Sequence, residues 1–157
     1  MCTMLSFITT DVSISHELLQ KALRNVVVDT YNMISVDGDM STNDSLMILA
    51  NGEAGNQEIT EEGEDYNTFV EALYSICKAM ARMLAGDGEG ATALFTAHVV
   101  NADTKENART LAKSVICSSL TKAMIYGHDA NFGRILCALG YSGVIFDPEK
   151  VTESTRL

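Results

Sequence analysis

The chain opens with MCTMLSFITTD, in which Thr3 stands two residues from the amino terminus. A threonine hydroxyl is a weak nucleophile near neutral pH and needs a base. If Thr3 became the first residue, its own α-amine, with a reference pKa of about 7.7–8.0, would lie within reach of its Oγ and could be that base. Cleavage could begin with attack of this Oγ on the carbonyl of Cys2, giving an ester that hydrolyses. The alternative is an ordinary threonine at the start of a strand.

A second candidate is Glu89, in the glycine-rich stretch GDGEGAT (86–92). Its flanking glycines allow close approach to the backbone, so the carboxylate could bind a cationic group of a small ligand. A solvated turn carboxylate is the alternative. The stretch is not a phosphate-binding P-loop, because no Lys follows the glycines and no Ser or Thr stands in the required place.

The polar stretch DGDMSTND (37–44) contains three aspartates, which raises the question of calcium. The EF-hand pattern is not met, since Gly38 comes second and no Glu stands at the twelfth position. We therefore expect a hydrogen-bonded turn loop. Its density of Asp, Ser, Thr and Asn also suits a loop packed around a reaction centre.

The cysteines and histidines do not form a metal-binding pattern. No CxxC pair is present, and no His has another His or Cys at helical ligand spacing. Cys77 and Cys137 fall within apolar helical patterns, which favours buried small hydrophobes. The sequence predicts no metal site from these residues, which are Cys2, Cys77, Cys117, Cys137, His16, His98 and His128.

Composition excludes several classes of function. The formal charge is −10, from 21 acidic and 11 basic residues, and no Lys/Arg cluster exists, so we do not expect nucleic-acid binding. No apolar run approaches the roughly 20 residues of a membrane span, and the amino terminus does not read as a signal peptide. We expect a cytoplasmic protein of one domain, residues 1–157, because 157 residues suit one domain.

Hydrophobic periodicity predicts the elements that would position Thr3, the polar loop and Glu89. In the first half, a helix begins near Ser15, capped by Ser13 or Ser15, and runs to about Asp29. A second helix begins at Glu64 or Asp65 and ends before Gly86, with Phe69, Leu73, Ile76, Met80 and Met83 as its apolar stripe. Strands are predicted over 4–10, 30–36 and 46–52.

The second half of the chain is also predicted to contain both strands and helices. A strand is predicted over 93–100, followed by a helix that Thr104 caps and that runs through Ile116. A further helix runs up to Gly140 as its C-cap, and 143–146 forms a last strand fragment. Asp129, in GHDANFGRI (127–135) at the start of that helix, is either the helix cap or a direct site residue. Two strands in succession between helices favour an α+β layered sandwich over a doubly wound parallel sheet.

Four stretches occur in this order: TMLSFITTD, then VDGDMSTND followed by LANG, then GDGEGAT, then YGHDANFGRILCALGYSG. Together they closely resemble the β-chain region of the bifunctional ornithine acetyltransferase / glutamate N-acetyltransferase family of arginine biosynthesis. The resemblance runs from Met1 to about Phe146. It implies the αββα-type sandwich of the self-cleaving ornithine acetyltransferase / aminopeptidase-like fold.

In that family a precursor cleaves itself just before a Thr in a Met-Ala-Thr-Met-Leu-like sequence, and this Thr becomes the nucleophile. MCTML puts Thr3 in that position, with Cys2 in place of the common Ala, so the resemblance implies autocleavage between Cys2 and Thr3. Glu89 matches the family's substrate-binding glutamate. The implied reaction is ping-pong: acetyl passes from N2-acetylornithine to Thr3 and then to glutamate. It needs no cofactor, although some members also accept acetyl-CoA.

The resemblance also implies a partner, the α-chain of the same precursor, in an α2β2 heterotetramer. That α-chain, which would supply the oxyanion hole, has no counterpart in this sequence, and neither does the family's C-terminal stretch. Met1 and Cys2 are still attached, so the nitrogen of Thr3 is a peptide nitrogen, and Ala93 stands where a Lys is common near Glu89. We expect the isolated chain to be inactive. An aminopeptidase or amidase of the same self-cleaving fold and a non-catalytic fragment are the alternatives.

Overall fold

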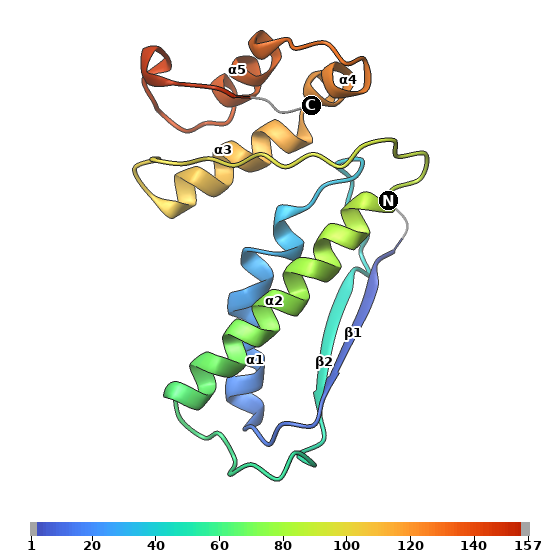
Figure 1. Ribbon diagram of the computed structural model, residues 1–157, viewed down its shortest axis with the longest axis vertical. Helices are drawn as coiled ribbons and strands as arrows, with labels where there is room; N and C mark the ends of the chain where they lie inside the picture. The colour runs from blue at the N-terminus through green and yellow to red at the C-terminus, as the bar shows by residue number, and fades with distance from the viewer. Residues whose placement is uncertain (1–2, 155–157) are drawn as a thin grey trace. The chain divides into compact units, whose positions relative to one another are not determined.

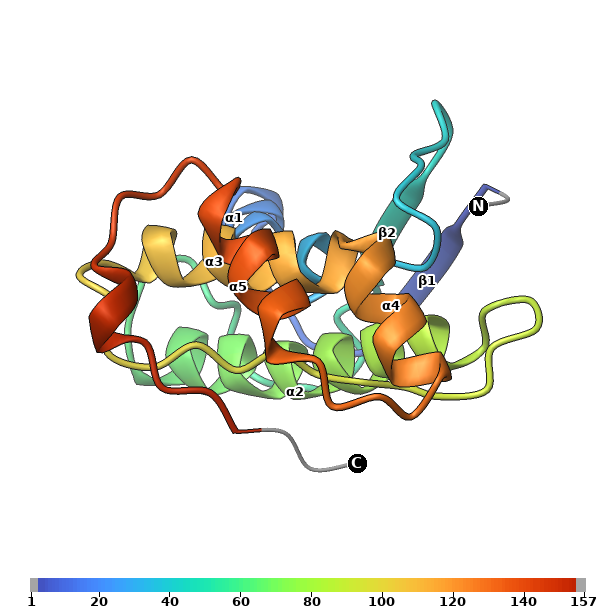
Figure 2. The same cartoon turned by 90° about the horizontal axis from the view of Figure 1, so that it is seen from above.

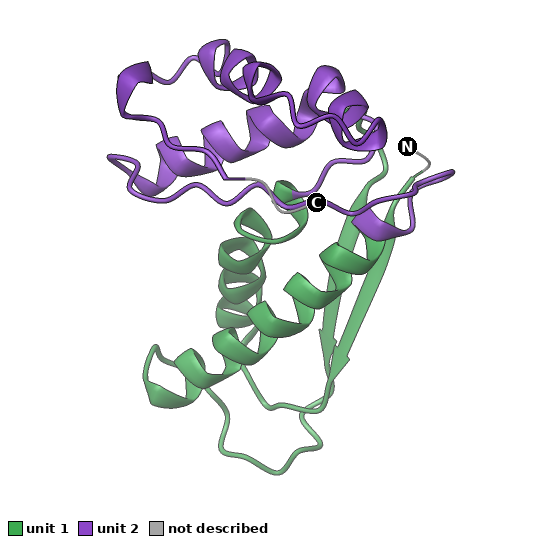
Figure 3. Cartoon of the chain, turned by 45° about the horizontal axis from the view of Figure 1, so that its top comes forward, with its two compact units in different colours: residues 1–33, 38–84 green, residues 34–37, 85–157 purple. Residues whose placement is uncertain are grey.

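The computed structural model describes residues 3–154, which divide into two compact units (Figure 3). The first unit comprises residues 3–33 and 38–84, and the second comprises residues 34–37 and 85–154. The prediction that residues 1–157 are one domain is not tested by this division and stays a prediction.

The first unit contains a parallel pair of strands, β1 (Leu5–Thr10) and β2 (Ser45–Ala50), with Leu5 opposite Ser45 (Figure 1). Parallel strands need a long crossover connection, and helix α1 (His16–Val28) provides it here. Ser6 and Ile8 are buried on one side of β1, whereas Leu5 and Phe7 on the other side are exposed. The pair is thus covered on one face only among the described residues.

Helix α1 begins as predicted, with Ser15 as its N-cap: its side chain accepts a hydrogen bond from Leu18 N. Helix α2 (Glu64–Gly86) also occurs where predicted, but its buried stripe is rotated. Ile76 and Met83 are exposed, while Tyr66, Leu73, Cys77 and Ala81 are buried. Burial raises the pKa of the Cys77 thiol, which keeps it protonated as the core residue that the sequence predicts.

The strand predicted over 30–36 is wrong. Thr30 donates its hydroxyl to the carbonyl of Val26, and a 3-10 helix, η1 (Tyr31–Met33), follows. The buried Tyr31 hydroxyl lies 2.8 Å from Ser6 Oγ. The β-favouring side chains of this stretch therefore end the preceding helix and fill the core beneath β1 instead of forming a ladder.

The second unit is built from α3 (Lys105–Cys117), α4 (Ser119–Tyr126), α5 (Phe132–Gly140) and a 3-10 helix, η2 (Pro148–Lys150). The helices α3, α4 and α5 contact one another, as two perpendicular views show (Figures 1 and 2). Their core consists of Leu111, Val115, Ala138 and Leu139. The eight-residue α4 is not among the predicted elements.

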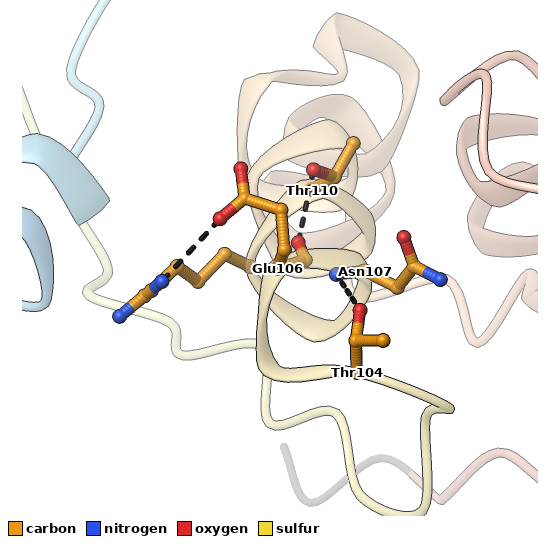
Figure 4. Close-up of polar contacts among 5 residues, drawn as sticks. Thr104, Glu106, Asn107 and Thr110 are labelled. Carbon is orange, nitrogen blue, oxygen red and sulfur yellow. Dashed lines mark hydrogen bonds and ion pairs between the residues drawn. The ribbon is translucent and has the colours of Figure 1, made fainter.

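Helix α3 begins at the predicted cap. The Thr104 hydroxyl accepts from Asn107 N at 3.1 Å, Thr110 Oγ1 donates to the Glu106 carbonyl, and Arg109 pairs with the Glu106 carboxylate at 3.4 Å (Figure 4). Helix α5 differs from the prediction at both ends. Its N-cap is Asn131 rather than Asp129, and Gly140 is its last residue rather than its cap.

The strands predicted over 93–100 and 143–146 pair with no other strand among residues 3–154. The alternating apolar side chains that predicted these strands are nevertheless packed: Phe95, Ala97 and Val99 contact the α3–α5 core, as do Val144 and Phe146. A strand also requires a neighbouring edge, which the described residues do not supply. Cys137, predicted to be buried, is exposed.

None of the helices in residues 3–154 combines the length and the hydropathy that a membrane crossing requires.

Candidate active site

The parallel pairing of β1 and β2 determines what surrounds Thr3. Thr3 lies two residues before the start of β1, and the polar loop 38–44 directly precedes β2. Because the amino ends of parallel strands lie at the same edge, the topology brings Thr3 beside this loop.

The loop contacts Thr3 through a hydroxyl and a carboxylate. Thr3 Oγ1 lies 2.8 Å from Ser41 Oγ, and Thr3 itself is exposed. One oxygen of Asp44 accepts from Met4 N at 2.8 Å, and the other accepts from Ser41 N at 3.1 Å. Ser41 Oγ also accepts from Asn43 N at 3.2 Å, so the neighbour of Thr3 is fixed by the loop backbone. The loop therefore lies beside Thr3, and its role around a reaction centre stays a prediction.

This arrangement orients the Thr3 hydroxyl but does not activate it. A serine hydroxyl is neutral near pH 7 and cannot act as the base that a threonine nucleophile needs. Both oxygens of Asp44 are already engaged by backbone N–H groups. These contacts supply no base to Thr3 Oγ1, which is consistent with a base that comes from Thr3 itself, its α-amine.

Glu89 occupies a tight turn in the second unit. Ala91 N donates to the carbonyl of Gly88 at 2.8 Å, which makes Glu89 and Gly90 the two central residues. Gly90 has a φ of +70°, the value that a type II turn requires at its third position and that glycine adopts without strain. The Glu89 side chain is exposed, so its carboxylate can meet a ligand from solvent.

Gly88 is needed for a different reason. A Cβ built on Gly88 would lie 3.0 Å from Val36 Cγ1, closer than ordinary van der Waals contact. The absent side chain lets the turn pack directly on Val36. The close approach of a ligand to the backbone, which the flanking glycines of Glu89 predict, stays a prediction.

The predicted site residues have different outcomes. Thr3 lies in the first unit and Glu89 in the second. Cys2, and with it the proposed cleavage site between Cys2 and Thr3, lies outside the described residues. The sequence pointed to the polar stretch 37–44 as a whole, but not to Ser41 or Asp44 as the residues that contact Thr3 and Met4. Within residues 3–154, no group of three or more His, Cys, Asp or Glu side chains could hold a metal ion.

The fold has a close counterpart among solved structures. The crystal structure of the arginine biosynthesis bifunctional protein ArgJ from Bacillus halodurans matches it with a TM-score of 0.89 and 47% identity, covering 92% of this chain and 68% of that chain. The fold thus defines an α+β protein of the same class as that bifunctional protein, as the fold prediction expected.

Sequence comparison gives the family. The ArgJ family model matches residues 1–155, and the chain belongs to the ArgJ family. The arginine biosynthesis bifunctional protein ArgJ 1 of Clostridium acetobutylicum is 54% identical over 96% of this chain. The corresponding protein of Caldanaerobacter subterraneus is 52% identical over 96% of this chain. The chain spans only 37% and 38% of the length of these two relatives. The resemblance described from the sequence motifs is confirmed.

Proposed function

We propose that this chain is the β-part of an ornithine acetyltransferase, which moves an acetyl group from N2-acetylornithine to glutamate through an acetyl-Thr3 ester. The observation that carries the proposal is the exposed Thr3 hydroxyl, held 2.8 Å from Ser41 Oγ by a loop that also binds Met4 N. The relatives' names, which refer to arginine biosynthesis and to two functions, support the same reaction.

Autocatalytic cleavage between Cys2 and Thr3 would convert the Thr3 peptide nitrogen into an α-amine. That amine would take the proton from Thr3 Oγ as the oxygen attacks the acetyl carbonyl of N2-acetylornithine. The resulting ammonium would return the proton to the departing ornithine amine, leaving acetyl-Thr3. The amine of glutamate would then attack this ester and release N-acetylglutamate and free Thr3. No cofactor takes part, and acetyl-CoA is an alternative acetyl donor.

Glu89 would bind an amine of the amino acid: the side-chain amine of N2-acetylornithine or ornithine, or the α-amine that ornithine has once the acetyl group has left. Its carboxylate is exposed at the tip of a turn whose shape two glycines maintain. A carboxylate–ammonium hydrogen bond is charge-assisted, which suits recognition of a basic amino acid.

An α-chain from the same precursor would complete the site, in an α2β2 heterotetramer that acts in the cytoplasm. The sheet supports the existence of such a partner. On the face of β1–β2 away from the core, Leu5, Phe7 and Leu49 are 57–59% exposed and Met47 is 43% exposed. A contiguous apolar face of this kind is typical of a surface that another polypeptide covers.

The test is a precursor in which the α-portion of a relative precedes Met1. We expect a new chain that starts at Thr3, and a tryptic peptide from its start that is heavier by one acetyl group after incubation with N2-acetylornithine. Thr3→Ala should abolish both, and Thr68→Ala, at an exposed threonine of α2, should abolish neither. An adduct on another peptide, or full activity of Thr3→Ala, would refute the proposal.

The acceptor is tested in the same experiment. Acetyl transfer that depends on glutamate supports the transferase. Release of acetate at the same rate with and without glutamate would instead favour an amidase of the same self-cleaving fold.

A further inference from the structure

Two lysines of the second unit bind the backbone of one short segment. Lys113 of α3 donates from Nζ to the Ile34 carbonyl at 2.5 Å, and Lys122 of α4 donates to the Val36 carbonyl at 2.6 Å. Both side chains are half-buried. Hydrogen bonds from an ammonium are shorter and stronger than those between neutral groups, so this pair, the lysine clamp, is a firm attachment for residues 34–36.

Burial and the two charges give the lysine clamp a cost. Burial lowers the pKa of Lys113, and the nearby ammonium of Lys122 lowers it further, whereas Cys117 acts in the opposite direction. Two like charges have been brought together and partly removed from water. The two lysines therefore fix residues 34–36 at a cost in desolvation and charge repulsion. This cost is consistent with a position of the segment that matters for function.

The segment that the clamp holds supports the turn of Glu89. Val36 Cγ1 would lie 3.0 Å from a Cβ on Gly88, so the backbone of Gly88 rests against the Val36 side chain. Gly88 in turn opens the hydrogen-bonded turn that ends at Ala91 and carries Glu89. A continuous series of contacts thus runs from the Lys122 ammonium through Val36 and Gly88 to Glu89.

We propose that Lys122, supported by Lys113, is a positioning residue for substrate binding: it holds Val36 where the turn must rest for Glu89 to meet the substrate's amine. This rests on the proposed role of Glu89. Neither lysine touches substrate. Loss of the clamp should let the turn move and weaken ground-state binding of the amino acid while the chemistry at Thr3 continues.

Kinetics of the self-cleaved, active enzyme test the clamp. Lys122→Met should raise KM for N2-acetylornithine roughly tenfold with kcat changed less than threefold, the pattern of lost binding rather than lost transition-state stabilisation. Lys122→Arg, which keeps a cationic donor, should restore much of the difference. Lys150→Met, at an ammonium-bearing side chain 84% exposed in the same unit, should have no effect.

The contact between Gly88 and Val36 is tested independently of any lysine. Gly88→Ala should raise KM as Lys122→Met does, because the new methyl displaces the turn from Val36. The double variant Gly88→Ala/Val36→Ala removes the methyl that the alanine would meet and should recover part of the wild-type KM. These two variants test the contact even if the Lys122 variant folds poorly.

Glu89→Gln separates failure of the clamp from failure of the proposed function. If Glu89→Gln raises KM and adding Lys122→Met to it raises KM no further, the clamp acts through Glu89. If Glu89→Gln raises KM but Lys122→Met changes neither KM nor amide exchange at residues 88–91, the clamp is refuted and the role of Glu89 stands. If Glu89→Gln leaves KM unchanged, the role of Glu89 is refuted, and with it the positioning proposal. An equal fall in kcat and in thermal stability, without a KM change, would mean that Lys122 is only structural.

Discussion

Asp44 ties the start of β1 to the loop beside Thr3, and its removal tests whether this loop orders the nucleophile. One carboxylate oxygen accepts from Met4 N at 2.8 Å and the other from Ser41 N at 3.1 Å. A hydrogen bond to a charged group contributes about 1.5–3 kcal/mol where it is shielded, and the exposure of Asp44 reduces this to about 1 kcal/mol each. Asp44→Ala should therefore destabilise the chain by about 2 kcal/mol.

At about 2–4 °C per kcal/mol for a chain of this length, the melting temperature of Asp44→Ala should fall by about 4–8 °C. Asp44→Asn keeps one acceptor and should lose about half as much. In the cleaved enzyme, formation of acetyl-Thr3 should slow, because Ser41 is no longer fixed beside Thr3 Oγ1. Asp103→Ala, at an exposed carboxylate before α3, is the matched control. An Asp44→Ala melting temperature within 1 °C of the control would refute this account of the loop.

Three further predictions concern stability and association. Both carboxylate oxygens of Glu153 are buried and have no hydrogen-bond partner among residues 3–154, and burial raises the pKa of this carboxyl. The stability that the protonated carboxyl contributes is therefore lost as pH rises through the raised pKa. Glu153→Gln should raise the melting temperature at pH 7.5 but not at pH 4. Thr104→Ala removes the cap of α3 and should cost about 1 kcal/mol in a urea titration, against no change for Thr68→Ala. Phe7→Asp should reduce self-association of the isolated chain in size-exclusion chromatography, and unchanged elution would show that the exposed sheet face does not drive it.

The elements that the sequence predicted well are those whose determinants are local. Ser15 and Thr104 cap α1 and α3 as predicted, because a cap needs only its own hydroxyl and the N–H three residues on. The rotated stripe of α2 shows the limit of periodicity. Several faces of that helix carry apolar residues, and only packing decides that Tyr66 is buried and Met83 is exposed.

The strands were harder, because a strand depends on residues far away in the sequence. The 30–36 stretch has the composition of a strand, yet Thr30 and Tyr31 bond to Val26 and Ser6, and the carbonyls of Ile34 and Val36 bind lysines. The 93–100 stretch keeps its alternation but pairs with no edge among the described residues. Composition predicted extended backbone; it could not predict the partner.

The candidate site also contains residues that local motifs identify and residues that only distant pairing brings near. Thr3 and Glu89 were identified from motifs, whereas Ser41 is 38 positions from Thr3 and is brought beside it only by parallel pairing across α1. No local pattern encodes that pairing. The lysine clamp was missed for the same reason, since Lys113 and Ile34 are 79 positions apart.

The contacts that hold the Thr3 hydroxyl do not require a free α-amine on Thr3. The hydrogen bonds that hold this residue use Thr3 Oγ1 and the nitrogen of Met4, and the proposed cleavage before Thr3 would change neither atom. The loop can therefore orient the hydroxyl before such a cleavage, which would turn the amide nitrogen of Thr3 into a basic amine. An oxygen oriented in this way is suited first to attack the carbonyl before it and then, with the new amine as base, to attack a substrate. On this account one set of contacts serves both reactions, and Ser41→Ala should slow cleavage and acetylation together.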